Sequence, residues 1–284
     1  MKPSEAPQVL VGIDPGPEAE SVVRFAAREA ALRGAPLHLH HALGRHTSTP
    51  DAAGDLFTVA ETVLKPYMAL VRNEFPQVKA RTVADPGAPA AGLVDRSPEC
   101  ALIVLGRRGS GGFARLVVGS VSMQVATHAN CPVTVVQGEP PAPWRVVVGV
   151  DRPEEDQAAL EFAAEEALLR DVPLHLVHAE SHPQALPLGM APPGQSDQAG
   201  LLHAAQQILD QEAHRWQELR PGLRTSTEAL RTNAAAALVE ASHDAGLLVV
   251  GTHQRNPLTR VLLGSVSAHL LHHAHCPVTV VPRQ

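Results

Sequence analysis

Three glycines and a serine form the segment of this chain whose residue types best suit phosphate binding. Two residues separate Gly106 from Gly109, and nine more separate Gly109 from the pair Gly119-Ser120. Glycine lets the backbone approach a phosphate without a Cβ atom in the way, and the free amides that begin a helix attract negative charge. The segment therefore favours an anion cradle, although short glycine motifs also occur in turns that bind nothing.

An acidic residue follows the first apolar run of the chain. Asp14 ends Val-Gly-Ile-Asp, and Asp151 ends the matching Val-Gly-Val-Asp further along. A carboxylate there can accept hydrogen bonds from the sugar or base of a nucleotide, or it can cap the helix that follows. Arg107 and Arg108 can contact phosphates or stay solvated. The residues alone do not decide between nucleotide binding and helix capping for the aspartates, or between phosphate binding and solvation for the arginines.

The sequence contains two copies of one domain. At a shift of 137 residues, 18 of 34 positions from Val9 to Ala42 are identical; at a shift of 145, 12 of 18 positions from Gly119 to Val136 are identical. Such internal repetition indicates a duplicated unit. We expect a first domain over 1–137, a Pro-rich linker over 138–143 and a second domain over 144–284. The longer shift places an insertion within 180–200, whose Pro, Gly and small polar residues predict a long loop.

Each copy alternates short apolar runs with helical patterns, and Gly34 is well placed to end the first helix. Strands alternating with helices favour a parallel sheet with helices on both faces. In such a sheet, ligands bind at the carboxyl ends of the strands where strand order reverses. In the first copy we predict strands over Val9–Ile13, Leu37–Ala42, Val78–Val83, Ala101–Leu105 and Val133–Val136, and helices over Glu18–Arg33, Thr62–Asn73, Ala88–Ser97 and Gly119–Ala129.

Composition narrows the class of protein. With 284 residues, 44% hydrophobic and 18% charged, the chain suits two globular domains. A net charge of −6 without a long Lys/Arg run argues against nucleic acid as a partner. No apolar run approaches the roughly 20 residues of a membrane span, and Met1–Gln8 lacks the apolar stretch of a signal peptide. Cys100, Cys131 and Cys276 show no Cys-x-x-Cys spacing, which favours small buried side chains in a reducing compartment. We therefore expect a cytoplasmic protein without a membrane partner.

Metal and catalytic patterns are weak. The 16 histidines include His272-His273-x-His275, but this spacing does not place a zinc pair on one helix face, so we predict no metal site. His38 and His41, with His175 and His178 in the second copy, are expected to pack in or at the end of a strand. The chain has neither a Gly-Lys-Ser/Thr phosphate loop nor a Gly-x-Ser-x-Gly elbow. We predict no catalytic residues, while slow ATP hydrolysis stays open.

Together, Asp14, the glycine–serine motif and the Cys-Pro-Val of the last strand resemble the ATP-binding branch of the universal stress protein family. The resemblance covers essentially the whole chain. It implies two repeated five-stranded parallel α/β domains of the adenine nucleotide α-hydrolase-like fold, paired within the chain as a pseudo-dimer, and leaves a further homodimer open. It also implies a regulatory stress-response role with ATP, bound together with Mg²⁺. The implied ATP-binding residues of the first copy are Asp14, Ala42, Leu105, Gly106, Gly109, Gly119, Ser120, Val121 and Ser122.

The second copy departs from the family pattern. Gln254 stands where the second glycine of the motif belongs, and Thr232 replaces the glycine that matches Gly87. A glutamine side chain where the backbone must meet phosphate predicts a degenerate site. The matching positions there are Asp151, Ala179, Val250, Gly251, Gly264, Ser265, Val266 and Ser267.

Three functions remain to be separated: an ATP-binding regulatory protein, an interaction or dimerisation module without nucleotide, and an enzyme that transfers phosphoryl or adenylyl groups or slowly hydrolyses ATP. Bound nucleotide would separate the first from the second, and sustained metal-dependent turnover would reveal the third.

Overall fold

The computed structural model describes residues 7–43, 52–107, 118–137, 145–180, 195–252 and 263–283. Two compact units divide the chain. One is formed mainly by Met1–Glu139 and the other mainly by Pro140–Gly251 and Gly264–Gln284. The linker expected over 138–143 lies outside the described residues, as do Gly109 and Gln254.

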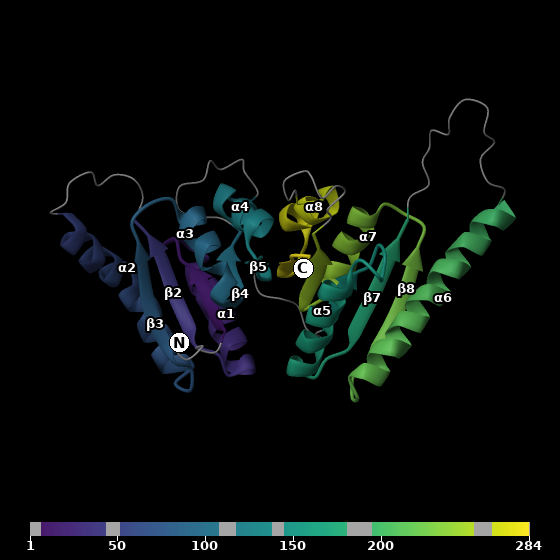
Figure 1. Cartoon of the computed structure of the whole chain (residues 1–284), viewed down its shortest axis with the longest axis horizontal. Helices are drawn as coiled ribbons and strands as arrows, with labels where there is room; N and C mark the ends of the chain where they lie inside the picture. The colour runs from purple at the N-terminus through teal and green to yellow at the C-terminus, as the bar shows by residue number, and fades with distance from the viewer. Residues whose placement is uncertain are drawn as a thin grey trace, which may run out of the picture. The chain divides into compact units, whose positions relative to one another are not determined.

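In the first unit, five parallel strands lie in the order β3-β2-β1-β4-β5 (Figure 1). Helices α1 and α2 pack together, and α3 packs with α4. The strands are β1 (Gln8–Gly12), β2 (Leu37–Ala42), β3 (Ala80–Asp85), β4 (Cys100–Gly106) and β5 (Val133–Val136). The helices are α1 (Ala19–Arg33), α2 (Ala52–Glu74), α3 (Pro89–Arg96), the 3-10 turn η1 (Ser97–Glu99) and α4 (Ser120–His128).

The core of the first unit lies on both faces of the sheet. Val9, Leu10 and Val11 are consecutive in β1, and all three are 0% exposed. Since neighbouring residues of a strand point to opposite faces, helices must cover both. The expected parallel α/β architecture is confirmed.

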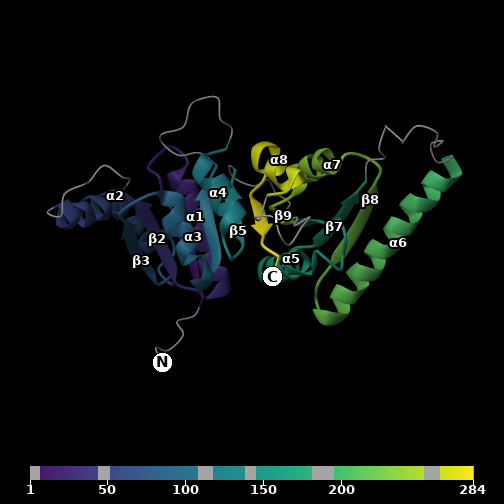
Figure 2. The ribbon, with the colours of Figure 1, turned by 45° about the horizontal axis from the view of Figure 1, so that its top comes forward.

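The second unit repeats this plan with the strand order β8-β7-β6-β9-β10. The long helix α6 packs along the edge strand β8 (Figure 2). The strands are β6 (Val146–Gly149), β7 (Leu174–Ala179), β8 (Thr225–Leu230), β9 (Leu247–Gly251) and β10 (Val278–Val281). The helices are α5 (Gln157–Arg170), α6 (Gln195–Leu219), α7 (Ala234–Ala241), the 3-10 turn η2 (Ser242–Asp244) and α8 (Ser265–His273).

Three predicted segments differ from the structure by two or more residues at a boundary, while the other predicted elements of the first copy agree within one residue. Helix α2 begins at Ala52 rather than Thr62, because the Ala, Leu and Val residues ahead of Thr62 extend a helix without needing the apolar periodicity. The third strand begins at Ala80 rather than Val78, since the Val78 amide closes a turn on the carbonyl of Phe75. The loop expected over 180–200 is shorter, because α6 takes its last six residues, from Gln195 on.

The residue that ends the first helix of each unit gives a stability prediction. Gly34 ends α1 at φ 62°, as predicted, and its counterpart Asp171 ends α5 at φ 51°. This left-handed region suits glycine and strains other residues by about 1 kcal/mol. We expect Asp171→Gly to stabilise the second unit by about 0.5–1 kcal/mol and Gly34→Ala to destabilise the first by about 1 kcal/mol, measured as shifts in urea unfolding.

The Asp171 side chain offers little that would offset this gain. It is 99% exposed, and its ion pair with Arg224 spans 3.2 Å, whereas the stronger contact from Arg224 goes to the backbone carbonyl of Asp171 and survives the change. Exposed ion pairs contribute about 0–1 kcal/mol. A lower unfolding midpoint for Asp171→Gly would contradict the argument from backbone strain.

Candidate functional site

Strand order reverses between β1 and β4. The chain passes from β1 to β2 and β3 on one side and then returns to place β4 on the other side of β1. Asp14 follows β1 by two residues and is exposed, while Gly106 is the last residue of β4. Ala42 ends β2 beside them and is half-buried. These three predicted residues therefore lie at the edge of the sheet where open α/β sheets bind ligands.

Hydrogen bonds fix the end of β1 just before Asp14. The amide of Ile13 donates to the carbonyl of His40 at 2.8 Å, and the ring Nδ1 of His41 donates to the carbonyl of Ile13 at 2.8 Å. A carbonyl can only accept, so Nδ1 of His41 carries the hydrogen. His178 makes the same bond to Val150 at 2.9 Å in the second unit. The predicted strand-end role of these histidines is confirmed.

The two ends of the glycine–serine motif meet. The amide of Gly119 donates to the carbonyl of Arg107 at 2.8 Å, and the hydroxyl of Ser122 donates to the carbonyl of Gly106 at 2.8 Å. Ser122 is buried, so its hydroxyl holds α4 against β4 rather than facing the solvent beside exposed Ser120. The residues from 108 to 117, which include Gly109, lie outside the described part of the chain.

Helix α4 begins with amides that precede its first internal hydrogen bond. That bond runs from Met123 to Gly119 over 3.2 Å. Gly119 has no side chain with which to cap the helix, and the amides of Ser120, Val121 and Ser122 come before the first donor. The helix start thus presents partial positive charge at the carboxyl end of β4.

A cation stands beside this helix start. Arg107 follows β4 directly, and its amide continues the β4–β5 pairing by donating to Val136 at 3.2 Å. Within the described residues, its buried Nε atom has no hydrogen-bond partner. A buried guanidinium donor without an acceptor is costly unless a ligand or water completes it.

The second unit has a carboxylate near its strand ends that the first unit lacks. Asp156 begins α5, but its side chain turns back and accepts hydrogen bonds from the amides of Asp151 at 2.8 Å and Arg152 at 3.1 Å. A Cβ atom built on Gly251 would lie 3.2 Å from Oδ1 of Asp156, so this carboxylate reaches from the end of β6 to the end of β9. The repeat aligns Asp156 with Ala19 of the first unit.

Other changes follow in the same place. The repeat aligns Arg107 with Thr252, a buried neutral residue. Two arginines bind Glu155, in the segment between β6 and α5. Arg283 donates to the backbone carbonyl and the carboxylate of Glu155, and Arg152 pairs with the same carboxylate at 2.8 Å. The hydrogen bond from helix to strand is kept in the second unit: the hydroxyl of Ser267 donates to the carbonyl of Gly251 at 3.2 Å, as Ser122 donates to Gly106 in the first.

The remaining predicted positions occupy equivalent places in the two units. Leu105 and Val250 are buried in β4 and β9, and Ala179 ends β7 as Ala42 ends β2. Ser265, Val266 and Ser267 begin α8 behind Gly264. Ala19 and Asp156 were not among the predicted residues, although an apolar residue aligned with an acidic one beside a predicted site was a usable signal.

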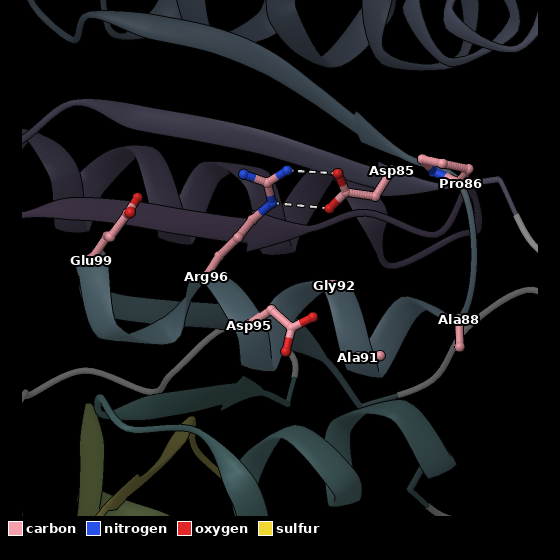
Figure 3. Close-up of a pocket in the computed structure, with 8 residues that line it drawn as sticks. All are labelled: Asp85, Pro86, Ala88, Ala91, Gly92, Asp95, Arg96 and Glu99. Atoms are coloured by element: carbon pink, nitrogen blue, oxygen red, sulfur yellow. Dashed lines mark hydrogen bonds and ion pairs between the residues drawn. The ribbon is translucent and has the colours of Figure 1, made fainter. Parts of the chain in front are cut away.

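A separate pocket of about 390 Å³ lies beside α3 and shares no residue with the predicted site (Figure 3). Arg96 reaches from α3 to Asp85, with hydrogen bonds of 2.9 Å from Nε and 2.6 Å from Nη2, while Asp95 points away from this pair. The Asp85 carboxylate also lies 2.9 Å from Nε2 of His40, whose side chain is 1% exposed.

Ionisation of this cluster is set by burial and by Arg96. The hydrogen bonds from Arg96 hold the pKa of Asp85 below its ordinary value. Burial lowers the pKa of His40, although its hydrogen bond to Asp85 acts in the opposite direction. Neutral His40 therefore donates its Nε2 hydrogen to a charged Asp85 near pH 7. The repeat aligns these three positions with Val177, Leu230 and Ala241, so the cluster belongs to the first unit alone.

Within the described ranges, no group of three or more His, Cys, Asp or Glu side chains is arranged to hold a metal ion. In the same ranges, none of the helices combines the length and the apolar character needed to cross a membrane.

The strand orders define a duplicated parallel α/β protein. The universal stress protein family model matches residues 6–137 and again 144–282. The chain belongs to the universal stress protein family, in its tandem form.

One relative and two solved structures illustrate what this chain is similar to. A universal stress protein of Mycobacterium tuberculosis is 33% identical over 291 residues, which cover 96% of this chain and 95% of that protein. The crystal structure of a universal stress protein from Archaeoglobus fulgidus shares the fold with a TM-score of 0.71 at 17% identity, covering 98% of both chains. Another solved structure is that of the universal stress protein from Archaeoglobus fulgidus in complex with dAMP. The match covers 46% of this chain and 98% of that chain, at 29% identity and a TM-score of 0.38.

Proposed function

We propose that this protein is an ATP-binding regulatory universal stress protein whose first unit carries the nucleotide site. Asp14 is placed to accept hydrogen bonds from the ribose or base. In this proposal the amides that begin α4, together with Arg107, bind the phosphates. Mg²⁺ would enter as the complex that it forms with the phosphates of ATP. In this proposal, bound ATP alters the surface that the first unit presents to protein partners.

The observation that carries the proposal is a difference of charge between the two strand-end regions. The first unit combines Arg107, whose buried Nε lacks an acceptor within the described residues, with the uncharged Ala19. At the aligned positions, the second copy of the repeat has neutral Thr252 and the carboxylate of Asp156, which already accepts hydrogen bonds from two backbone amides. Arg152 and Arg283 of the second region are already engaged with Glu155, so a triphosphate finds an available cation in the first region and an extra carboxylate in the second. We therefore infer one ATP per chain.

The nucleotide content of the purified protein tests this proposal. The protein is denatured, the released adenine nucleotide is counted per chain, and the count is repeated after incubation with Mg-ATP. One nucleotide per chain is expected. Two nucleotides per chain would contradict the role given to Asp156. No bound nucleotide at millimolar ATP would favour the alternative function, an interaction module that binds no nucleotide. Sustained metal-dependent turnover would reveal the enzyme instead.

Gly119→Ala is expected to weaken ATP binding at least tenfold without unfolding the protein. Gly119 has an ordinary φ of −69°, and a Cβ atom there would meet only the carbonyl of Arg107, at 3.6 Å, among the described residues. The fold therefore tolerates alanine, while in this proposal the added methyl group crowds phosphates that approach the first amides of α4. Isothermal titration with ATP measures the change.

Gly264→Ala is the matched control, because Gly264 begins α8 with a similar φ of −60° in the second unit. It should leave ATP binding unchanged. Equal losses in the two variants would place the nucleotide in both units, and no loss in either would overturn the assignment to the glycine–serine motif.

A further inference from the structure

Two cysteines far apart in the sequence meet at the end of the first sheet that lies away from the predicted nucleotide site. Cys100 begins β4, whereas Gly106 ends it. Cys131 precedes β5, which pairs with β4 in the register Ile103 to Val133. Continuing that register back by two residues brings Cys131 opposite Ala101, next to Cys100. Neighbouring strands lie about 4.8 Å apart and a strand rises about 3.3 Å per residue, so the Cα atoms of Cys100 and Cys131 are expected roughly 6 Å apart, within the separation of about 4.4–6.8 Å that a disulfide spans.

The strand end is irregular at this point. On its other side, β4 pairs with β1, and the register shifts there because Gln8 lies opposite Cys100 while Val9 lies opposite Leu102. An extra residue of this kind breaks the strict alternation of side chains and redirects them. Each of the two thiols influences the pKa of the other, as expected of sulfur atoms that lie close together.

Polar groups gather around the sulfur of Cys100. The side-chain amide of buried Gln8 donates to it over 3.7 Å, and its own hydrogen is directed at the carbonyl of Arg96 over 3.3 Å. Hydrogen bonds from Cys131 and Gln8 lower the pKa of Cys100, while donation to Cys100 and burial raise the pKa of Cys131. One sulfur is thus suited to become the thiolate and the other to remain a thiol.

We propose that Cys100 and Cys131 form a reversible intramolecular disulfide when the protein meets a hydroperoxide. The Cys100 thiolate attacks one peroxide oxygen, and with one proton the second oxygen leaves as water, which gives a sulfenic acid. The Cys131 sulfur then attacks the Cys100 sulfur and loses its proton, while the sulfenic oxygen leaves as a second water. In sum, two thiols and one hydrogen peroxide give one disulfide and two waters.

The second unit supplies a natural comparison. The repeat aligns Cys276 with Cys131, but it aligns Cys100 with Ala245 and Gln8 with Arg145. Cys276 is buried, and burial raises its pKa to about 12. It therefore lacks both a second cysteine at the aligned position and the thiolate character that peroxide requires.

Oxidation should also reach α3. A disulfide removes the Cys100 hydrogen that is directed at the Arg96 carbonyl, and Arg96 holds Asp85 at the edge of the sheet. Reversible oxidation would thus alter the terminus of α3 while leaving the strand ends near Gly106 in place.

Counting thiols tests the proposal. The reduced, folded chain is treated with hydrogen peroxide, denatured in an alkylating reagent and weighed by mass spectrometry. The number of alkylated cysteines should fall from three to one, a peptide joining Cys100 to Cys131 should appear, and dithiothreitol should restore all three. Cys276→Ala should lose two of two. In Cys131→Ser, Cys100 should be trapped as a sulfenic acid by dimedone, and in Cys100→Ser no disulfide should form.

Three results would overturn the inference. They are three alkylated cysteines after peroxide, a cross-linked peptide that contains Cys276, and loss of two thiols in Cys100→Ser. Cys100 and Cys131 are 8% and 4% exposed, so a chain that reacts only after urea unfolding would also count against a site in the folded protein.

Discussion

Replacing Ala19 by aspartate is expected to reduce ATP binding by at least 100-fold. The change gives the first unit the carboxylate that Asp156 provides in the second. Two like charges 4 Å apart in a partly buried site repel by about 4 kcal/mol, and each 1.4 kcal/mol is about a factor of ten. Pro15 stands where Arg152 donates an amide in the second unit, so the new carboxylate would have one donor fewer to neutralise it. Isothermal titration at constant ionic strength measures the loss.

Two controls separate charge from volume. Ala19→Asn adds nearly the same volume without charge and should bind ATP within a few-fold of the original protein, whereas Asp156→Ala removes the carboxylate from the other unit and should leave the first site unchanged. Ala19→Asp must remain folded by circular dichroism for the comparison to hold. Full ATP affinity in that variant, or equal weakening by Ala19→Asn, would contradict the electrostatic argument.

Asp85→Ala is expected to destabilise the first unit by about 3 kcal/mol. The change leaves the buried Nε2 hydrogen of His40 without its acceptor, and an unsatisfied buried polar group costs about 1–3 kcal/mol. It also removes both hydrogen bonds from Arg96, whose side chain is partly exposed, so solvent limits their contribution. Urea unfolding followed by the fluorescence of an extrinsic dye and by circular dichroism measures the change.

Asp95→Ala is the matched control for Asp85→Ala. Asp95 is a carboxylate on α3 that lines the same pocket, yet it is exposed and points away from Asp85 (Figure 3). Its removal should change the free energy of unfolding by about 0.5 kcal/mol or less. Similar losses in both variants would show that general charge in the pocket, rather than the bonds of Asp85, is responsible.

The effect of Asp85 should depend on pH in a defined direction. Its pKa is lowered in the folded protein from the ordinary value of 3.8. A lowered carboxyl pKa contributes stability above the unfolded value and loses it as the pH falls through the folded value. The difference in stability between the original protein and Asp85→Asn should therefore be full at pH 6 and shrink below about pH 4. A constant difference across that range would contradict the role of the charged carboxylate.

Most of the fold could be predicted from the hydrophobic periodicity and the internal repeat of the sequence. The strands Leu37–Ala42 and Val133–Val136 have the predicted bounds, because short apolar runs between turn residues leave little choice of length. The start of α2 was missed, since residues 52–60 mix helix formers such as Ala and Leu with Gly, Asp and Thr and show no clear apolar periodicity. Tertiary packing, which the sequence does not display, decides where such a helix begins.

The candidate site was located by sequence but not resolved into roles. The pattern placed Gly106 and Gly119 at a strand end and a helix start, and the structure has them there. It could not indicate that Ser122 turns inward, because a serine side chain has several rotamers and the pattern names none of them. Nor could it indicate that Asp156 turns from its helix toward the preceding loop, since an aspartate at a helix start usually caps that helix.

Ser122, the buried serine two residues after the Gly119-Ser120 pair, affects how nucleotide sites should be counted from sequence motifs. Ser122 joins α4 to β4, and Ser267 joins α8 to β9 through the same pair of atoms, although the two units differ in charge at the strand ends. That serine would remain under selection for assembly of the domain even after its ligand had been lost. A search that relies only on the Gly-Ser helix start and the serine two residues later therefore scores this chain as two nucleotide sites, and it overestimates ligand stoichiometry in duplicated proteins unless it also weighs the residues aligned with Gly109, Ala19 and Arg107.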